Sequence, residues 1–331
     1  MSFARLKLCA LLLCVCAFAA AQQTTPASPP ADTQEQPQGP TFRANVREVP
    51  VYFVVKDKHG ALVPNLTKDS FTVLEDGTPQ TIKSFRADTD RPLTLGLMID
   101  TSGSQMRVLD YEKEAGAQFI KQVLTPKDEA FMISFDVNVN LDEDLTGDKQ
   151  ALIHALNKER INVGGGGGGI PGIGQGPINM PPKGTLLFDA AYLAANDKMK
   201  QEAGRKALIF LTDGGDQGSQ MKLRDAIEAT QKADTICYVI LISDSGQGSP
   251  GDMRKLSEET GGRLIQVGNN FAKLEQAFQQ IGDELRSQYE LTYTPTNTKM
   301  DGGFRKIEVK EKDGDKVQAR KGYYAQAGNE Q

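Results

Sequence analysis

Between residues 92 and 286, continuously apolar runs alternate with segments whose apolar residues recur every three or four positions. This alternation of strand and helix patterns is typical of a parallel, doubly wound sheet with helices on both faces. Strands covered on both faces have no exposed side, which explains why the runs are apolar throughout. We therefore predict an α/β domain with a mostly parallel sheet over residues 91–287. The expected strands occupy residues 93–99, 130–135, 207–211, 236–242 and 264–267.

Patterns of β-structure flank this region on both sides. Apolar residues alternate over residues 49–55 before it and over residues 289–293 after it, as in half-buried strands. Two or three exposed strands are marginal in water on their own. We therefore expect segments 41–90 and 288–325 to pair in one small β-sandwich, with the α/β domain inserted between them. Two separate hairpin extensions are the alternative.

Polar residues of interest occur at three places, two after apolar runs and one at the start of a helical pattern. One run ends at Asp100, which Ser102 and Ser104 follow in an Asp-x-Ser-x-Ser pattern. Another run ends beside Asp213, and Thr185 stands at the start of a helical pattern. In open α/β sheets, ligands bind at the carboxyl ends of the strands. Carboxylates and hydroxyls are the hard oxygen donors that magnesium and manganese require, and neither His nor Cys belongs to the set.

Each of these motifs also has a plainer interpretation. Asp and Ser are common helix caps, so Asp-Thr-Ser-Gly-Ser alone could be an ordinary strand-to-helix turn; the three motifs in this order favour a cation site. We expect Asp189 to lie on a helix face and Asp216 in a loop. The acidic stretch from Asp136 to Asp142 lacks the glycine and the closing glutamate of a calcium loop, so we expect a solvated strand there.

The three motifs together resemble the metal ion-dependent adhesion site (MIDAS) of von Willebrand factor A (VWA) domains, which have a Rossmann-like fold. The resemblance covers residues 92–286. It implies one divalent cation, Mg²⁺ or otherwise Mn²⁺ or Ca²⁺. Ser102 and Ser104 would bind it directly, Thr185 directly or through water, and Asp100 and Asp213 mostly through water. An Asp or Glu carboxylate of a partner protein would fill the open coordination position.

The first β flank also resembles VWA-related proteins that acidobacteria export. One departure from the family pattern is a long Gly-rich insertion at residues 163–182, just before Thr185. Its six consecutive glycines carry a high entropic cost of ordering, so we expect a flexible loop. A phosphate-binding loop is disfavoured because the Gly-Lys-Ser/Thr ending is missing.

The N-terminus has the pattern of a secretory signal peptide over residues 1–21. Arg5 and Lys7 precede an apolar run that ends in small residues. That run is shorter than the about 20 residues needed to span a bilayer, and we expect no transmembrane segment in the mature chain. Residues 22–40, rich in Pro and Gln, should form a disordered linker. We expect an exported protein, periplasmic or extracellular, that keeps Cys237 alone and so forms no internal disulfide.

Composition and catalytic residues narrow the function further. The formal net charge of −5, with scattered Lys and Arg, disfavours nucleic acid as a partner. His59 and His154 lie outside the metal motifs, and Cys237 sits in an apolar strand, so no nucleophilic constellation is expected. We therefore expect a non-enzymatic adhesion or assembly protein. A metal-dependent hydrolase or phosphatase with Asp100 as nucleophile, and a structural subunit with a purely stabilising metal, are the alternatives.

Overall fold

The computed structural model describes residues 48–87, 91–162, 184–242, 248–268 and 270–325. All of them belong to the unit Val46–Gln331. The predicted signal peptide, the linker and the Gly-rich loop at 163–182 lie outside the described residues. Among those that are described, no helix is both long and apolar enough to cross a membrane.

A six-stranded sheet with the order β10-β9-β8-β5-β6-β7 forms the centre of the α/β region. Every neighbouring pair is parallel except β6 and β7, which are antiparallel. The predicted doubly wound, mostly parallel sheet is therefore confirmed. The strands are β5 (Leu93–Asp100), β6 (Glu129–Phe135), β7 (Val139–Thr146), β8 (Arg205–Thr212), β9 (Ile236–Leu241) and β10 (Leu264–Gln266).

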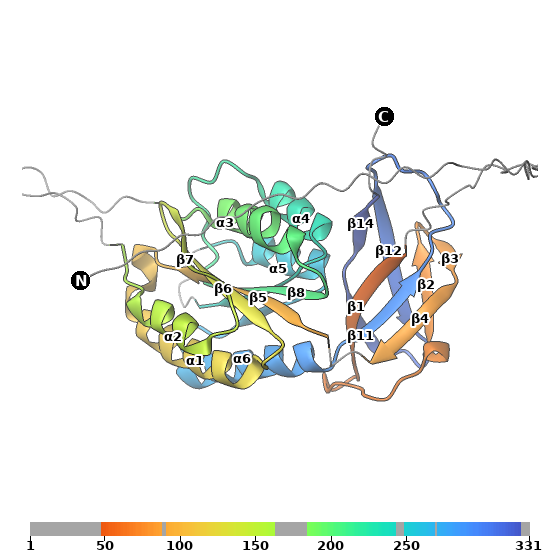
Figure 1. Cartoon of the computed structure of the whole chain (residues 1–331), viewed down its shortest axis with the longest axis horizontal. Coiled ribbons are helices and arrows are strands. Elements are labelled where there is room, and N and C mark those ends of the chain that lie inside the picture. Colours follow the sequence, from red (N-terminus) through yellow and green to blue (C-terminus); the bar gives the residue numbers. More distant parts are fainter. Residues whose placement is uncertain (1–47, 88–90, 163–183, 243–247, 269, 326–331) are drawn as a thin grey trace, which may run out of the picture. The chain divides into compact units, whose positions relative to one another are not determined.

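Helices cover both faces of this sheet (Figure 1). Side chains alternate along β5, so that Leu97 and Ile99 pack with one helix layer and Met98 with the other. The first layer consists of α1 (Leu109–Val123), α2 (Lys149–Lys158) and α6 (Phe271–Arg286). The second consists of α3 (Leu187–Leu193), α4 (Leu223–Lys232) and α5 (Pro250–Thr260). Shorter helical turns are η1 (Lys68–Ser70), η2 (Gly103–Arg107), η3 (Ala194–Lys198) and η4 (Met199–Gln201).

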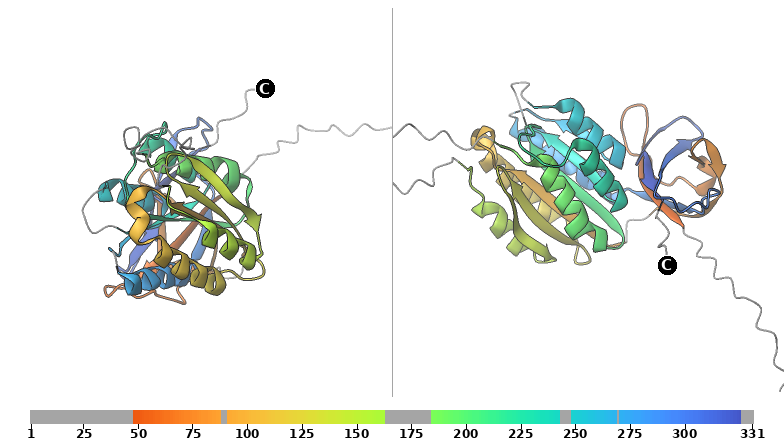
Figure 2. Two further views of the ribbon diagram at one scale, coloured as in Figure 1. Left: turned by 90° about the vertical axis from the view of Figure 1, so that its left-hand side faces the viewer. Right: turned by 90° about the horizontal axis from the view of Figure 1, so that it is seen from above.

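The two β flanks form one sandwich, as predicted. Its sheets have the orders β13-β1-β11-β4 and β14-β12-β2-β3, and N-terminal orange strands lie among C-terminal blue ones in both views (Figures 1 and 2). Phe53, Phe71 and Tyr289 pack their rings in the shared core. The strands are β1 (Val49–Lys56), β2 (Phe71–Glu75), β3 (Thr78–Gln80), β4 (Ile82–Ala87), β11 (Tyr289–Tyr293), β12 (Phe304–Glu311), β13 (Lys316–Ala319) and β14 (Gly322–Tyr324).

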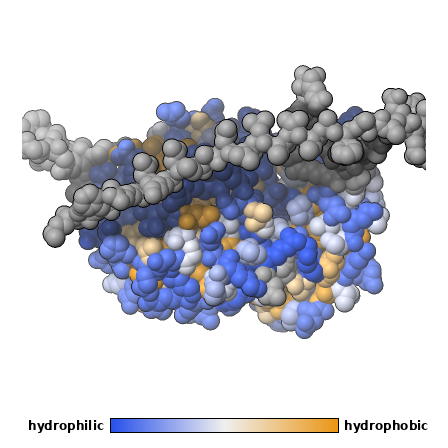
Figure 3. All heavy atoms as spheres, in the orientation of Figure 1, coloured by the Kyte–Doolittle hydropathy of each residue, from blue (hydrophilic) through white to orange (hydrophobic). Residues whose placement is uncertain are grey.

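Pairing across the insertion makes the sandwich possible. β1 runs antiparallel to β11, and β2 runs antiparallel to β12, so each sheet combines strands from before and after the α/β region. The apolar faces of all these strands are thereby buried against each other. On the face drawn in Figure 3, most of the visible surface is hydrophilic and the hydrophobic residues occur in small groups.

Candidate metal site

The first predicted loop begins at the end of the central strand β5. Asp100 is its last residue, and its side chain is completely buried. Its Oδ1 accepts a hydrogen bond from the backbone N–H of Ser102 at 3.0 Å, and its Oδ2 accepts one from the hydroxyl of Thr212 at 2.6 Å. The hydroxyl oxygens of Ser102 and Ser104 lie 3.0 Å apart. The Asp-x-Ser-x-Ser segment thus folds back on itself and gathers a carboxylate and two hydroxyls.

The second carboxylate follows the neighbouring strand. β5 and β8 are parallel, with Ile99 opposite Leu211, so Asp213 leaves β8 at the same sheet edge as Asp100. Its Oδ1 accepts a hydrogen bond from the N–H of Gly215 at 3.0 Å. Gly214 has a φ of +80°, and a Cβ there would come within 2.8 Å of a Leu241 methyl carbon. The turn that orients Asp213 therefore requires glycine.

Thr185 joins the third loop to the second. Its backbone pairs in both directions with that of Gln217, which lies in the loop after Asp213, at 2.9 Å for each hydrogen bond. The next residue, Leu186, donates its N–H to the carbonyl of Asp136 at 2.8 Å. The structure therefore places Thr185, which is 8% exposed, within hydrogen-bonded loops at this edge.

The last connection returns to the first loop. The hydroxyl of Thr101 donates to Oδ2 of Asp136 at 3.0 Å. Together with the bond from Thr212 to Asp100, these contacts close a ring of hydrogen bonds through all three predicted loops. Five residues from distant parts of the sequence are brought to one edge of the sheet by this ring: Asp100, Ser102, Ser104, Thr185 and Asp213.

Burial and neighbouring charge set the electrostatics of this edge. Burial raises the pKa of Asp100 to about 7; hydrogen bonds from Ser102 and Thr212 act against the shift, while the charge of Asp213 adds to it. An ionised Asp100 is therefore unfavourable until a positive charge comes close. Within the described ranges, no group of three or more His, Cys, Asp or Glu side chains could hold a metal. Two carboxylates with hydroxyls form a donor set that fits one hard divalent cation completed by water.

The two acids that we expected outside the site hold its loops in place. Asp216 Oδ1 accepts from the N–H of Phe188 at 3.1 Å and from the hydroxyl of Ser219 at 2.6 Å. Asp189 accepts from the backbone N–H groups of Gln220 and Met221 at 3.0 and 2.8 Å. These bonds tie α3, which follows Thr185, to the loop that carries Asp213.

Sequence reasoning missed several residues that matter here. The acidic stretch is a half-exposed strand in β7, but Asp136 is only 6% exposed and lies in the turn before it, so our expectation of a solvated strand was wrong for Asp136. Thr212 and Thr101 link the loops through their hydroxyls. Glu112, in the first turn of α1, is completely buried. Its position on the apolar stripe of α1 was the one signal that could have found it.

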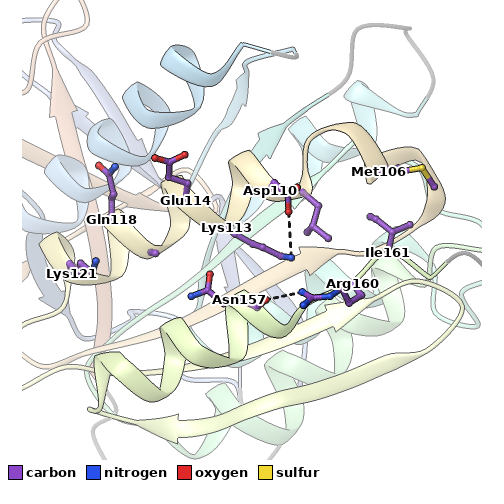
Figure 4. A pocket seen from close by; sticks show the side chains of 11 residues that line it. Met106, Asp110, Lys113, Glu114, Gln118, Lys121, Asn157, Arg160 and Ile161 are labelled. Carbon is purple, nitrogen blue, oxygen red and sulfur yellow. Dashed lines mark hydrogen bonds and ion pairs between the residues drawn. The ribbon is translucent and has the colours of Figure 1, made fainter.

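A groove adjoins the first loop (Figure 4). It lies between α1 and the end of α2 and has a volume of about 820 Å³. Met106, two residues after Ser104, borders one end with its side chain 59% exposed. Lys113 lies in the middle, 3.7 Å from Asp110, and Arg160 faces it from the end of α2. The groove next to the first loop is therefore lined by apolar, basic and acidic side chains.

Comparison with known proteins gives matches only among solved structures. No family profile and no curated protein matches the sequence. A von Willebrand factor type A protein from Catenulispora acidiphila is 13% identical, with 87% of this chain and 76% of that chain covered and a TM-score of 0.48. The protein BatB from Bacteroides thetaiotaomicron is 16% identical over 59% of this chain and 100% of that chain, with a TM-score of 0.45.

The third comparison is with proximal thread matrix protein 1 from the mussel byssus. It is 14% identical, with 72% of this chain covered and a TM-score of 0.48; this chain spans 50% of the mussel protein. A further structure of the mussel protein has zinc in its MIDAS motif. The similar structures are VWA-domain proteins, the class that the sequence motifs resemble. The six-stranded mixed sheet with helices on both faces is the fold expected of that class.

Proposed function

We propose that this chain is an exported, divalent-cation-dependent protein-binding module that serves adhesion or assembly. Its cation, Mg²⁺ or a similar ion, is held by Asp100, Ser102, Ser104, Thr185 and Asp213 and binds an Asp or Glu carboxylate of a partner protein. The observation that carries the proposal is the closed ring of hydrogen bonds, which joins the three ligand loops at the carboxyl edge of the sheet. Ligands bind at this edge in open α/β sheets.

The chain's own residues have distinct parts in this proposal. Asp100 is fixed by Thr212 and by the backbone of Ser102, so its carboxylate cannot turn away from the edge. The Ser102 and Ser104 hydroxyls are neutral donors and leave most of a cation's charge uncompensated. A bound divalent cation would supply the positive charge that attracts an acidic side chain from outside. The groove beginning at Met106 offers further surface to the same partner.

We propose binding rather than catalysis for this site. His154 is exposed on α2, and His59 lies in a turn after β1, so neither belongs to the three ligand loops. Cys237 is buried in β9, and burial raises the pKa of its thiol to about 12, which keeps it protonated and unreactive. These positions favour an adhesion or assembly module over a hydrolase.

Replacing Asp100 tests the proposal directly. Asp100→Ala should abolish calorimetric binding of Mg²⁺ and Mn²⁺, because it removes a fixed carboxylate from the site. Zn²⁺ joins the titration because the similar mussel protein holds it. Glu308→Ala is the matched control, since Glu308 is a half-exposed acid on β12 of the sandwich, outside the three ligand loops and the groove. Asp100→Asn serves as a second variant that keeps the shape of the side chain.

Partner binding is read on the same proteins. Immobilised mature protein should retain a partner from the source organism's envelope fraction in Mg²⁺ and release it in chelator. Asp100→Ala should retain none, and Glu308→Ala should behave as the unmodified protein does. Retention of the same partner by Asp100→Ala with undiminished affinity in chelator would refute metal-bridged binding.

A further inference from the structure

A third acid lies in the first turn of α1, the helix that follows the first ligand loop, and has no assigned part in the candidate metal site. Glu112 belongs to α1, and its side chain is 0% exposed. Neither of its carboxylate oxygens has a hydrogen-bond partner among the described residues. Its neighbours on the same helix face, Leu109, Gly116 and Phe119, are buried and apolar. A buried carboxylate in such surroundings is costly unless another group balances it.

Gln105, one residue after Ser104, is also a buried polar residue without hydrogen-bond partners for its side chain among the described residues. It is 1% exposed, and both its amide nitrogen and its amide oxygen lack partners in the part of the chain that the structure describes. Buried polar atoms are nearly always hydrogen-bonded to protein or to ordered water. Four such atoms, two from Gln105 and two from Glu112, lie on the segment that continues directly from the ligand loop. The segment that follows the ligand loop therefore has four buried polar atoms without a partner in the described part of the chain.

Backbone hydrogen bonds lead from the ligand loop to Glu112: Gln105 donates to Ser102, Val108 to Gln105 and Glu112 to Val108, each at 3.0 Å. Burial raises the pKa of Glu112 well above its usual value, and the charges of Asp100 and Asp213 raise it further; Lys113 acts in the opposite direction. Lys113 itself lies 3.7 Å from Asp110. No ion pair within the described residues includes Glu112, Asp100 or Asp213. All three acids thus lack an ion-pair partner in the described part of the chain, and a bound cation would favour their ionised forms.

We propose that Glu112 is an additional carboxylate of the cation site, which acts on the bound ion through ordered water from the buried side. Gln105 connects this water to the ligand loop. The inference rests on the cation site of the proposed function. Action through water agrees with the finding that no three acids among the described residues are arranged to hold a metal directly. Carboxylates outside the direct ligands commonly tune metal sites in this way.

Two opposite effects follow from this position. The charge of Glu112 tightens the hold on the cation, and it also lowers the positive charge that the cation presents to a partner's carboxylate. Glu112 would therefore set the balance between retaining the ion and binding the partner. A purely structural Glu112 would affect the stability of the fold without affecting cation affinity.

The test uses the cation alone, because no partner is identified. Glu112→Gln keeps the size of the side chain and removes its charge. Calorimetric titration of the mature protein with Mn²⁺ and Mg²⁺ should give a dissociation constant about tenfold higher for Glu112→Gln. Melting in chelator should be unchanged, since a neutral amide of the same size replaces a buried carboxyl that holds its proton when no cation is bound. Glu75→Gln is the matched control, because Glu75 is 2% exposed and has an unpartnered oxygen but lies in the β-sandwich.

The outcomes separate this inference from the proposed function. Weaker cation binding in Glu112→Gln, with normal binding in Glu75→Gln, supports the inference. If Glu112→Gln binds Mn²⁺ as the unmodified protein does while Asp100→Ala loses it, Glu112 is structural and the inference is overturned, although the proposed site stands. If Asp100→Ala also binds normally, the cation site itself is wrong and both proposals fall.

Discussion

Buried carboxylates occur in two regions of this molecule with different surroundings. Glu284, 2% exposed, binds Lys56 Nζ at 2.8 Å and Arg263 Nε at 2.6 Å, which links α6 to the sandwich strand β1. Glu290, also 2% exposed, lies 2.7 Å from a nitrogen of Arg86. Asp100 and Glu112 are buried to the same degree at the sheet edge, but no ion pair within the described residues includes them.

The two regions differ in whether the chain itself supplies a positive partner for its buried acids. A buried acid whose positive partner belongs to the same chain is satisfied as soon as the chain folds. A buried acid without such a partner tends to keep its proton, and a cation from solution would favour its ionised form. The stability of the first region should therefore not depend on divalent cations, whereas that of the second should.

The largest expected effect comes from removing a paired buried acid, Glu284. Glu284→Ala leaves Lys56 and Arg263 without their shared carboxylate, and we expect the free energy of unfolding to fall by about 3–5 kcal/mol. The loss should be the same in Mg²⁺ and in chelator. Urea denaturation in both conditions measures it. Glu258→Ala is the control: its carboxylate is half-exposed and 3.7 Å from Arg254, so the change should stay within about 0.5 kcal/mol. A Glu284→Ala loss seen only in chelator would erase the distinction between the regions.

The next effect is a pH dependence of the free energy of unfolding, which arises from the unpaired buried acid Asp100. Because burial raises the pKa of Asp100 from 3.8 to about 7, the native state holds a proton that the unfolded chain releases over this range. The free energy of unfolding in chelator should therefore fall as pH rises from about 4 to about 7, by about 1.4 kcal/mol for each pH unit between the two pKa values. Asp100→Asn should remove this part of the slope. Divalent cation added at pH 8 should restore stability in the unmodified protein but not in Asp100→Asn.

A second buried acid with a raised pKa, Glu159, provides the control for that measurement. Burial also raises the pKa of Glu159 to about 7, with the charge of Asp142 adding to the shift. Glu159→Gln should therefore reduce the slope in chelator as well, but it should leave the stabilisation by Mg²⁺ intact. If Asp100→Asn and Glu159→Gln respond to Mg²⁺ in the same way, the cation does not act through Asp100.

The sequence predicted the strands of the central sheet better than the contacts at the candidate metal site. Continuous apolar runs located β5, β8 and β9 because burial on both faces leaves a direct compositional trace. The bond from Thr212 to Asp100 depends on the register of two strands, which local patterns do not report. Glu112 was missed for a related reason, since helical periodicity predicts which face is buried but not that an acid will lie on it.

The smallest effect should come from an exposed donor at the same edge. Ser104 is exposed, and its hydroxyl lies 3.0 Å from that of Ser102. Ser104→Ala should change the free energy of unfolding in chelator by no more than about 0.5 kcal/mol, as for other surface substitutions.

Cation affinity should nevertheless fall in Ser104→Ala, because one of the few direct donors is lost while every buried carboxylate remains. Ser287→Ala, at the exposed end of α6, is the matched control and should leave both quantities unchanged. Thermal melting in chelator and Mn²⁺ titration on the same two variants make the comparison. A Ser104→Ala protein with unaltered Mn²⁺ affinity would remove Ser104 from the ligand set and leave Asp100, Ser102, Thr185 and Asp213. The hydroxyl of Ser104 would then serve only its neighbour Ser102.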